Sequence, residues 1–254
     1  MTRILAVVPA RMSSSRFPGK PLKKINGIPM IAHCYFRALQ AKQITKVVLA
    51  TPDEEIMQFG NEFGIETVLT SNKHERATER VEEVLQIYKK QDEEYDYVLL
   101  LQGDEPQVTP KEIDNLAVAL QSSSNCVVNV IHPIQDDDMQ NPSVVKSILD
   151  SHGNILFFSR AHIPYKSDSG YRQLGMIGFT AKILEKYCQL KPTTLEITES
   201  IDMMRFLEND IAISSLMTHK SIIGVDHPED IKKVELLMAD DELVDAYSNL
   251  FIKK

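Results

Sequence analysis

Apolar, β-rich runs alternate with amphipathic stretches of helical period through the first half of the chain. The run DYVLLL at residues 96–101 is nearly continuous in its apolar character, which is typical of a strand buried on both faces. The predicted strands are 4–8, 46–51, 66–70 and 96–101, and the predicted helices are 29–41, 53–63, 78–90 and 110–120. Strand–helix repetition at this spacing predicts an α/β fold with a parallel, doubly wound sheet.

The pattern changes beyond the fourth helix. Short strands are predicted at 126–131, 144–149, 155–158 and 174–180, and the turn-rich DSHGN at residues 150–154 indicates a hairpin. Residues 126–180 are therefore expected to be antiparallel, as a small subdomain or an oligomer interface within a single domain spanning 1–254. A helix at 198–207, a strand at 211–217 and a final helix with Pro228 at its first position complete the prediction.

Two loops are expected to lie at the ligand-binding edge of this sheet. Doubly wound sheets bind ligands beyond the carboxyl ends of their strands. Residues 9–21 follow the first predicted strand, and QGDEP at residues 102–106 follows DYVLLL. We expect these two loops to converge on one site.

The composition is that of a soluble globular protein. Of the 254 residues, 43% are hydrophobic and 25% are charged, and the net charge of −8 argues against nucleic-acid binding. No apolar run approaches the roughly 20 residues of a membrane span. The first apolar run is too short for a signal peptide, so a cytoplasmic location is expected. Three dispersed cysteines show no zinc-ligand spacing and are predicted to be reduced core thiols.

Positive charge is concentrated at the front of the chain. Nine Lys and Arg residues precede the first carboxylate, Asp53, so only 19 of the 28 basic residues accompany the 36 acidic ones. Within VVPARMSSSRFPGKPL at residues 7–22, Arg11 and Arg16 offer planar forks for phosphate and Lys20 offers a point charge. The loop is not a P-loop or a GxGxxG fingerprint. A single Arg here would usually belong to a solvated loop, but three cations beside three serines favour phosphate binding.

Two separated aspartates suggest a metal ion. Asp104 follows a predicted buried strand and Asp226 precedes the final helix. Taken singly, each could equally serve a turn or a helix start. Together with the basic loop they indicate Mg²⁺-assisted chemistry on a nucleoside triphosphate, because Mg²⁺ prefers carboxylate and phosphate oxygens. Arg80 and Arg160 are candidate anion contacts, with surface salt bridges as the equal alternative.

Motifs spread in order over nearly the whole chain resemble one family. They include PAR at 9–11, PGKPL at 18–22, QGDEP at 102–106, NP at 141–142, FSRAHIP at 158–164 and GVD at 224–226. As a set they resemble the CMP-Kdo synthetases, the 3-deoxy-manno-octulosonate cytidylyltransferases. The resemblance implies a Rossmann-like nucleotidyltransferase fold and a homodimer formed through the middle third. It also implies transfer of CMP from CTP to the anomeric hydroxyl of a sugar acid, with release of pyrophosphate.

Carried over residue by residue, the resemblance implies three groups of site residues. The expected nucleotide contacts are Ala10, Arg11, Ser14, Arg16, Lys20, Thr78, Arg80, Gln102 and Gly103. The expected catalytic residues are Arg11, Lys20, Asp104 and Asp226, and the two aspartates are the expected Mg²⁺ ligands. The expected acceptor contacts are Arg160, Gln173, Glu199 and Asp202. Positioning and charge neutralisation carry most phosphoryl-type transfer, so little acid–base machinery is needed.

The chain departs from the family pattern mainly around the acceptor. Arg76 and Ala77 stand where the family has Ser and Gly, RQLGMIGF at 172–179 replaces RHLGxYxY, and Asp202-Met203 replaces Glu-Gln. A site that loses hydrogen-bonding groups discriminates differently between substrates. The nucleotide half of the site therefore looks intact and the acceptor half altered, and the preference for cytosine is open.

The first interpretation is an Mg²⁺-dependent, CTP-using cytidylyltransferase acting on an acidic acceptor, with Kdo as the default. Within the same class, the acceptor could be a modified octulosonate, another sugar acid or a phosphonate. A nucleotide-binding module without catalysis is the alternative from another class. Retention of Asp104 and Asp226 together with the basic loop disfavours that alternative.

Overall fold

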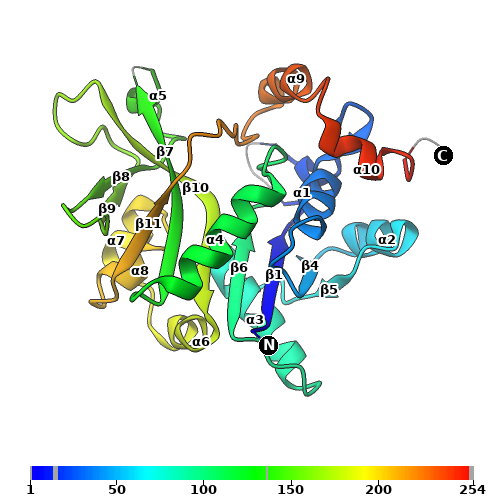
Figure 1. The fold of residues 1–254 in the computed structure, drawn as a ribbon, viewed down its shortest axis with the longest axis horizontal. Helices are drawn as coiled ribbons and strands as arrows, with labels where there is room; N and C mark the ends of the chain where they lie inside the picture. Colours follow the sequence, from blue (N-terminus) through cyan, green and yellow to red (C-terminus); the bar gives the residue numbers. More distant parts are fainter. Residues whose placement is uncertain (1, 14–16, 136, 252–254) are drawn as a thin grey trace.

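The computed structural model describes residues 2–13, 17–135 and 137–251. Within these ranges, one nine-stranded sheet runs through the molecule and a short two-stranded hairpin lies apart from it (Figure 1). The order along the main path is β11-β7-β10-β6-β1-β4-β5. These strands are β1 (Ile4–Pro9), β4 (Lys46–Thr51), β5 (Thr67–Leu69), β6 (Tyr97–Leu101), β7 (Val127–Gln135), β10 (Ser169–Thr180) and β11 (Ile213–Met217).

All strands of this path except β10 point the same way. The pairs β1–β4, β1–β6, β4–β5 and β7–β11 are parallel, whereas β10 lies antiparallel between β6 and β7. A hairpin of β8 (Lys146–Leu149) and β9 (Ile155–Ser159) extends antiparallel from β10. The predicted fold class, a mostly parallel α/β sheet with an antiparallel region, is confirmed, and the antiparallel strands belong to the main sheet.

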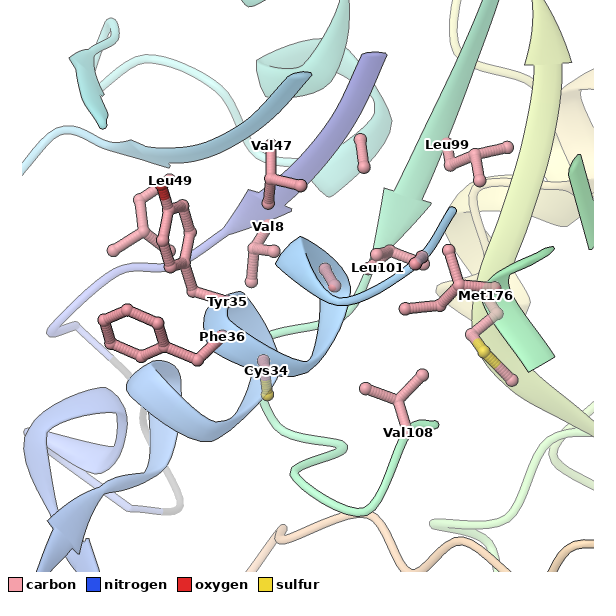
Figure 2. Close-up of a cluster of buried hydrophobic side chains, with 14 of the residues drawn as sticks. Val8, Cys34, Tyr35, Phe36, Val47, Leu49, Leu99, Leu101, Val108 and Met176 are labelled. Carbon is pink, nitrogen blue, oxygen red and sulfur yellow. The ribbon is translucent and has the colours of Figure 1, made fainter. Parts of the chain in front are cut away.

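Helices cover both faces of the sheet. On one face lie α1 (Met30–Leu39), α2 (Glu54–Phe63) and α4 (Pro110–Ser122), and on the other lie α3 (Ala77–Lys89), α6 (Ala181–Gln189), α7 (Thr194–Glu199) and α8 (Met204–Leu207) (Figure 1). Strand β1 is buried throughout and feeds both cores, because successive side chains of a strand point to opposite faces. Val8 packs with Cys34 and Met176 in the first core, whereas Val7 belongs to the second (Figure 2).

The C-terminal segment packs back onto α1. It contains α9 (Pro228–Leu237), a 3₁₀ turn (Glu242–Val244) and α10 (Asp245–Ser248), and the stretch Asp137–Gln140 forms α5. Arg37 of α1 is fully buried and forms an ion pair with Asp241 at 2.6 Å. His33 bonds the Tyr247 hydroxyl at 2.8 Å, and burial lowers the pKa of His33 to about 4.

Two sequence predictions are wrong in detail. The helix expected at 198–207 is two short helices, α7 and α8, because Ser200 ends α7 in the left-handed region with a φ of 54°. Of the predicted core thiols only Cys34 is buried, while Cys126 and Cys188 are exposed. Cys126 directly precedes β7 and Cys188 lies near the end of the surface helix α6, so neither is covered by a second layer. None of the described helices is long and apolar enough to cross a membrane.

Candidate active site

The loops after β1 and β6 lie side by side, because these strands are parallel neighbours in the sheet. A cavity of about 280 Å³ opens between these loops and the N-terminus of α3. We call it the nucleotide pocket. Eight of the predicted site residues line it: Ala10, Arg11, Lys20, Arg80, Gln102, Gly103, Asp104 and Asp226. Ser14 and Arg16 were also predicted here, and they lie outside the described residues.

Lys20 connects the loop after β1 to the two loops that carry Asp104 and Asp226. Gly19, with a φ of 72°, turns the chain into a 3₁₀ turn (Lys20–Leu22) that begins with this lysine. The Lys20 ammonium donates to Asp104 Oδ2 and to the carbonyl of Val225, each at 2.8 Å. The Val225 amide donates to the Asp104 carbonyl at 2.9 Å, so the loop carrying Asp226 is fixed against the loop carrying Asp104.

Two glycines allow the backbone segments at the site to approach closely. A Cβ on Gly103 would lie 2.9 Å from the carbonyl oxygen of Pro9, the last residue of β1. Gly175 lies in an irregular stretch of β10, where a Cβ would lie 2.3 Å from Gln102 Cγ. The Gly175 carbonyl accepts from the Gln102 amide, and the Gly175 amide donates to Glu105 Oε1, both at 2.8 Å. The loop after β6 is thereby joined to β10 through main-chain and side-chain bonds.

The start of α3 presents both expected and unexpected residues. Arg80 is buried and donates to Thr70 Oγ1 and, at 3.1 Å, to the Ser71 carbonyl. Burial and the nearby Arg11 lower the pKa of Arg80. The family pattern placed Arg76 and Ala77 close to the nucleotide, and both line the nucleotide pocket. His74 and Glu75 also line it, and sequence reasoning did not assign them to the site. The available signal was their position just before Thr78 and Arg80, which were predicted nucleotide contacts.

Thr78, a predicted nucleotide contact, instead faces a predicted acceptor contact. Its amide and its hydroxyl donate to Asp202 Oδ2 at 3.2 and 2.9 Å. Burial raises the pKa of Asp202, and the two bonds from Thr78 oppose that shift. Thr78 is fully buried and is not among the residues lining the nucleotide pocket.

A second cavity of about 290 Å³ adjoins the nucleotide pocket, and we call it the acceptor pocket. Gln102, Asp104 and Asp226 line both. Three predicted acceptor contacts line the second cavity: Arg160, Gln173 and Asp202. The fourth, Glu199, is not among its lining residues, because its carboxylate accepts from the Ser159 hydroxyl and the Arg160 amide at 3.0 Å each.

The two aspartates fit an Mg²⁺ site of the kind completed by phosphate. No group of three or more His, Cys, Asp or Glu side chains suited to a metal ion occurs among the described residues. Mg²⁺ in nucleotide enzymes needs only one or two carboxylates, since waters and substrate phosphates supply the other ligands. Asp104 and Asp226 line the same cavities and come from two loops bonded to each other. Their neighbour Glu105 is buried, and burial raises its pKa to about 7.

A doubly wound sheet with cationic side chains and paired carboxylates at its carboxyl edge defines a nucleotidyltransferase. The family model described as cytidylyltransferase matches residues 5–219 of this chain. The chain belongs to the cytidylyltransferase family, and within it to the CMP-Kdo synthetases.

Curated and solved relatives agree with this assignment over nearly the full length. The mitochondrial 3-deoxy-manno-octulosonate cytidylyltransferase of Arabidopsis thaliana is 35% identical over 94% of this chain and 84% of its own. That of Thermodesulfovibrio yellowstonii is 34% identical over 91% of this chain and 96% of its own. A solved CMP:2-keto-3-deoxy-manno-octonic acid synthetase in complex with CTP is 33% identical with a TM-score of 0.86, covering 94% of this chain and all of that one.

Proposed function

We propose that this enzyme transfers CMP from CTP to Kdo or a closely related sugar acid, releases pyrophosphate and requires Mg²⁺. The names of the relatives and the CTP bound to the solved relative support the two substrates. One observation carries the proposal: Asp104 and Asp226 line the nucleotide pocket and the acceptor pocket at once. Reacting groups held in adjoining cavities need little further activation, because positioning supplies much of the rate.

The proposed reaction is a displacement at the α-phosphorus of CTP. The anomeric oxygen of the acceptor forms the new bond to phosphorus and gives up its proton to solvent water, and the bond to the pyrophosphate oxygen breaks, so that pyrophosphate leaves with the bonding electron pair. Arg11 and Lys20 bind the triphosphate and offset the negative charge that builds up on it. Gln102 and the close approach at Gly103 place the loop after β6 against both substrates.

Asp104 and Asp226 are the proposed Mg²⁺ ligands. An Mg²⁺ ion held by these two carboxylates would offset negative charge on the triphosphate. Asp104 is paired with Lys20 at 2.8 Å. Phosphate oxygens would draw Lys20 away from Asp104, because a triphosphate offers the ammonium several acceptors where the carboxylate offers one bond.

The test is pyrophosphate release with Mg²⁺, each of CTP, UTP, ATP and GTP, and a panel of acidic acceptors that includes Kdo. We expect release that depends on CTP and on a sugar acid. Asp104→Asn and Asp226→Asn should each lower kcat at least about 100-fold, the scale seen when one group stabilising transition-state charge is removed. The exposed Asp168→Asn is the matched control and should keep full activity. CTP binding without release for any acceptor would support the non-catalytic module instead.

A different sugar acid is the second candidate, favoured by the lining of the acceptor pocket. Ile177 and Met203 line this pocket at positions where the family pattern has Tyr and Gln. An apolar side chain cannot return a hydrogen bond to a sugar hydroxyl, so an acceptor with fewer hydroxyls there would bind better. Release of pyrophosphate with such an analogue at a higher kcat/KM than with Kdo would establish this acceptor.

We also propose that the enzyme is a cytoplasmic homodimer that pairs through residues 126–180. The hairpin of β8 and β9 extends from the main sheet at that region (Figure 1). Leu156 on β9 and Met217 on β11 are large apolar side chains that are exposed in the single chain. Sedimentation equilibrium should give twice the chain mass of 28.8 kDa, and Leu156→Asp should give the single mass.

A further inference from the structure

Arg172 on β10 carries a buried donor that no described residue of the chain accepts from. Its Nε atom is inaccessible to solvent and has no hydrogen-bond partner in the described part of the chain. Arg172 lines a third cavity, of about 460 Å³, which shares Asp104, Gln173 and Asp226 with the acceptor pocket. Buried donors in native proteins nearly always have partners, so an unpartnered guanidinium donor beside a cavity indicates an acceptor that enters from outside.

The cross-strand neighbours of Arg172 are both basic. Arg172 lies opposite His132 of β7 and opposite Lys146 of β8, so three basic side chains form a row across the sheet. The Lys146 ammonium donates to three main-chain carbonyls at 2.8, 2.9 and 2.8 Å, and His132 Nδ1 bonds the Thr218 carbonyl at 3.1 Å. Burial lowers the pKa of His132, so the charges that face one another are those of Arg172 and Lys146. Like charges placed directly opposite one another are destabilising, and an anion bound at Arg172 would reduce this repulsion.

The acidic residues that line the same cavity mostly have donors of their own. Asp104 pairs with Lys20, and Asp230 accepts from the amides of Asp226 and His227. Glu105 Oε1 accepts from the Gly175 amide, whereas Glu105 Oε2 is buried and, like Arg172 Nε, has no hydrogen-bond partner in the described part of the chain. Among the described residues, no carboxylate lies within ion-pair distance of the Arg172 guanidinium. Arg172 is near enough to Glu105 to oppose the rise in pKa that burial imposes on that carboxyl, so an anionic ligand would share the charge of Arg172 with Glu105.

Arg160, the arginine that the family pattern assigns to the acceptor, is engaged differently. Its guanidinium donates to the carbonyls of Glu199, Pro142 and Ser200 at 3.0, 3.1 and 3.4 Å. These bonds tie β9 to the end of α7 and to the loop before β8. Several of the five donors of Arg160 thus bond main-chain carbonyls of the segments around the acceptor pocket.

The chemistry of a 2-keto sugar acid fixes where its carboxylate must bind. The carboxylate carbon is bonded directly to the anomeric carbon, so the anion lies next to the hydroxyl that attacks phosphorus. The cavity lined by Arg172 is also lined by Asp104 and Asp226, where that hydroxyl must be placed. We infer that Arg172 binds the carboxylate of the acceptor through its planar fork. This inference rests on the proposed function and names the residue that binds the carboxylate of the acceptor.

The test compares Kdo with its C1 amide, which keeps the sugar and removes the charge. In the wild-type enzyme, kcat/KM for Kdo should exceed that for the amide at least about 30-fold, the scale of a buried charge pair that loses one partner. Arg172→Met should lower kcat/KM for Kdo by a similar factor and leave that for the amide unchanged. CTP affinity, measured by calorimetry, should not change. Arg172→Lys should recover part of the preference, since it restores the charge without the fork.

Thermal unfolding separates this role from a structural one. Removing one charge from the basic row should leave the Tm of Arg172→Met equal to or above that of the wild type. A clear fall in Tm, or an Arg172→Met enzyme that still prefers Kdo over the amide, would overturn the inference and leave the proposed function standing. A wild-type enzyme that binds CTP and uses neither acceptor would overturn both.

Discussion

Replacing Arg205 by Met should remove the main counter-ion of the buried Glu196 carboxylate and lower the stability of the protein. Arg205 and Glu196 are 2% and 1% exposed, and the guanidinium donates to both carboxylate oxygens at 2.6 Å each. It also bonds Glu79 at 3.2 Å and lies 4.0 Å from the ring centre of Tyr187. Breaking such a pair from one side costs about 3–5 kcal/mol when the remaining charge has no other partner. Arg76 Nε lies 3.5 Å from Glu196 Oε1, so the cost here should fall at the lower end of that range.

Protonation limits this cost and makes it depend on pH. An ordinary glutamic acid takes up a proton at pH 7 for about 4 kcal/mol, and at pH 5 for about 1 kcal/mol. In Arg205→Met the folded state would hold a proton that the unfolded state releases, so the variant loses stability as pH rises. The Tm deficit should be roughly 10 °C at pH 7 for a chain of this size, and only a few degrees at pH 5.

Differential scanning calorimetry at the two pH values measures the effect. The double variant Arg205→Met/Glu196→Gln is the control and should recover much of the lost Tm, because no charge remains buried. A deficit below about 2 °C at pH 7 would refute the reasoning. So would an equal deficit at pH 5 and pH 7, because the loss would then come from packing around the substituted side chain.

Three further substitutions test the site and the fold. Gly175→Ala puts a Cβ 2.3 Å from Gln102 Cγ and should lower kcat/KM at least about tenfold, because Gln102 lines both pockets; normal kinetics would contradict it. The pKa of His33 is lowered to about 4, so protonation of His33 should reduce the free energy of unfolding of the wild type by about 3 kcal/mol as pH drops from 6.5 to 4. In denaturant titrations His33→Gln should make this dependence on pH smaller. Asp241→Asn leaves Arg37 buried without its counter-ion and should cost about 2–3 kcal/mol of unfolding free energy, whereas an unchanged denaturation midpoint would rule this out.

The strands of the first half could be predicted because strands buried on both faces consist of unbroken runs of apolar residues. KVVLAT, for example, coincides with β4 (Lys46–Thr51). The hairpin of β2 (Lys24–Ile25) and β3 (Ile28–Pro29) was missed, although Asn26-Gly27 between apolar residues is a strong hairpin signal. The break at Ser200 could not be predicted, because the bonds of Glu199 to Ser159 and Arg160 join residues about 40 positions apart.

In the candidate site, too, features set by the local sequence could be predicted and features set by contacts between distant residues could not. Loop residues such as Lys20 and Asp104 could be placed because each follows a strand whose neighbour in the sheet was inferable. The state of each arginine could not be read from the sequence. Arg160 and Arg172 are the same residue type in the sequence. In the structure Arg160 donates to three carbonyls, whereas Arg172 has a buried donor with no partner among the described residues.

The departures from the family pattern on the two sides of the site form one network. Arg76, at the rim of the nucleotide pocket, donates to the Ser200 hydroxyl at 3.0 Å and lies 3.8 Å from Asp202 Oδ1. Asp202, in the acceptor pocket, is bonded by Thr78 at the start of the helix that Arg76 precedes. Residues in one hydrogen-bonded network have non-additive effects. The substitutions at 76 and 202 therefore have to be reverted together, because Arg76→Ser alone would remove a cation that faces the carboxylate of Asp202.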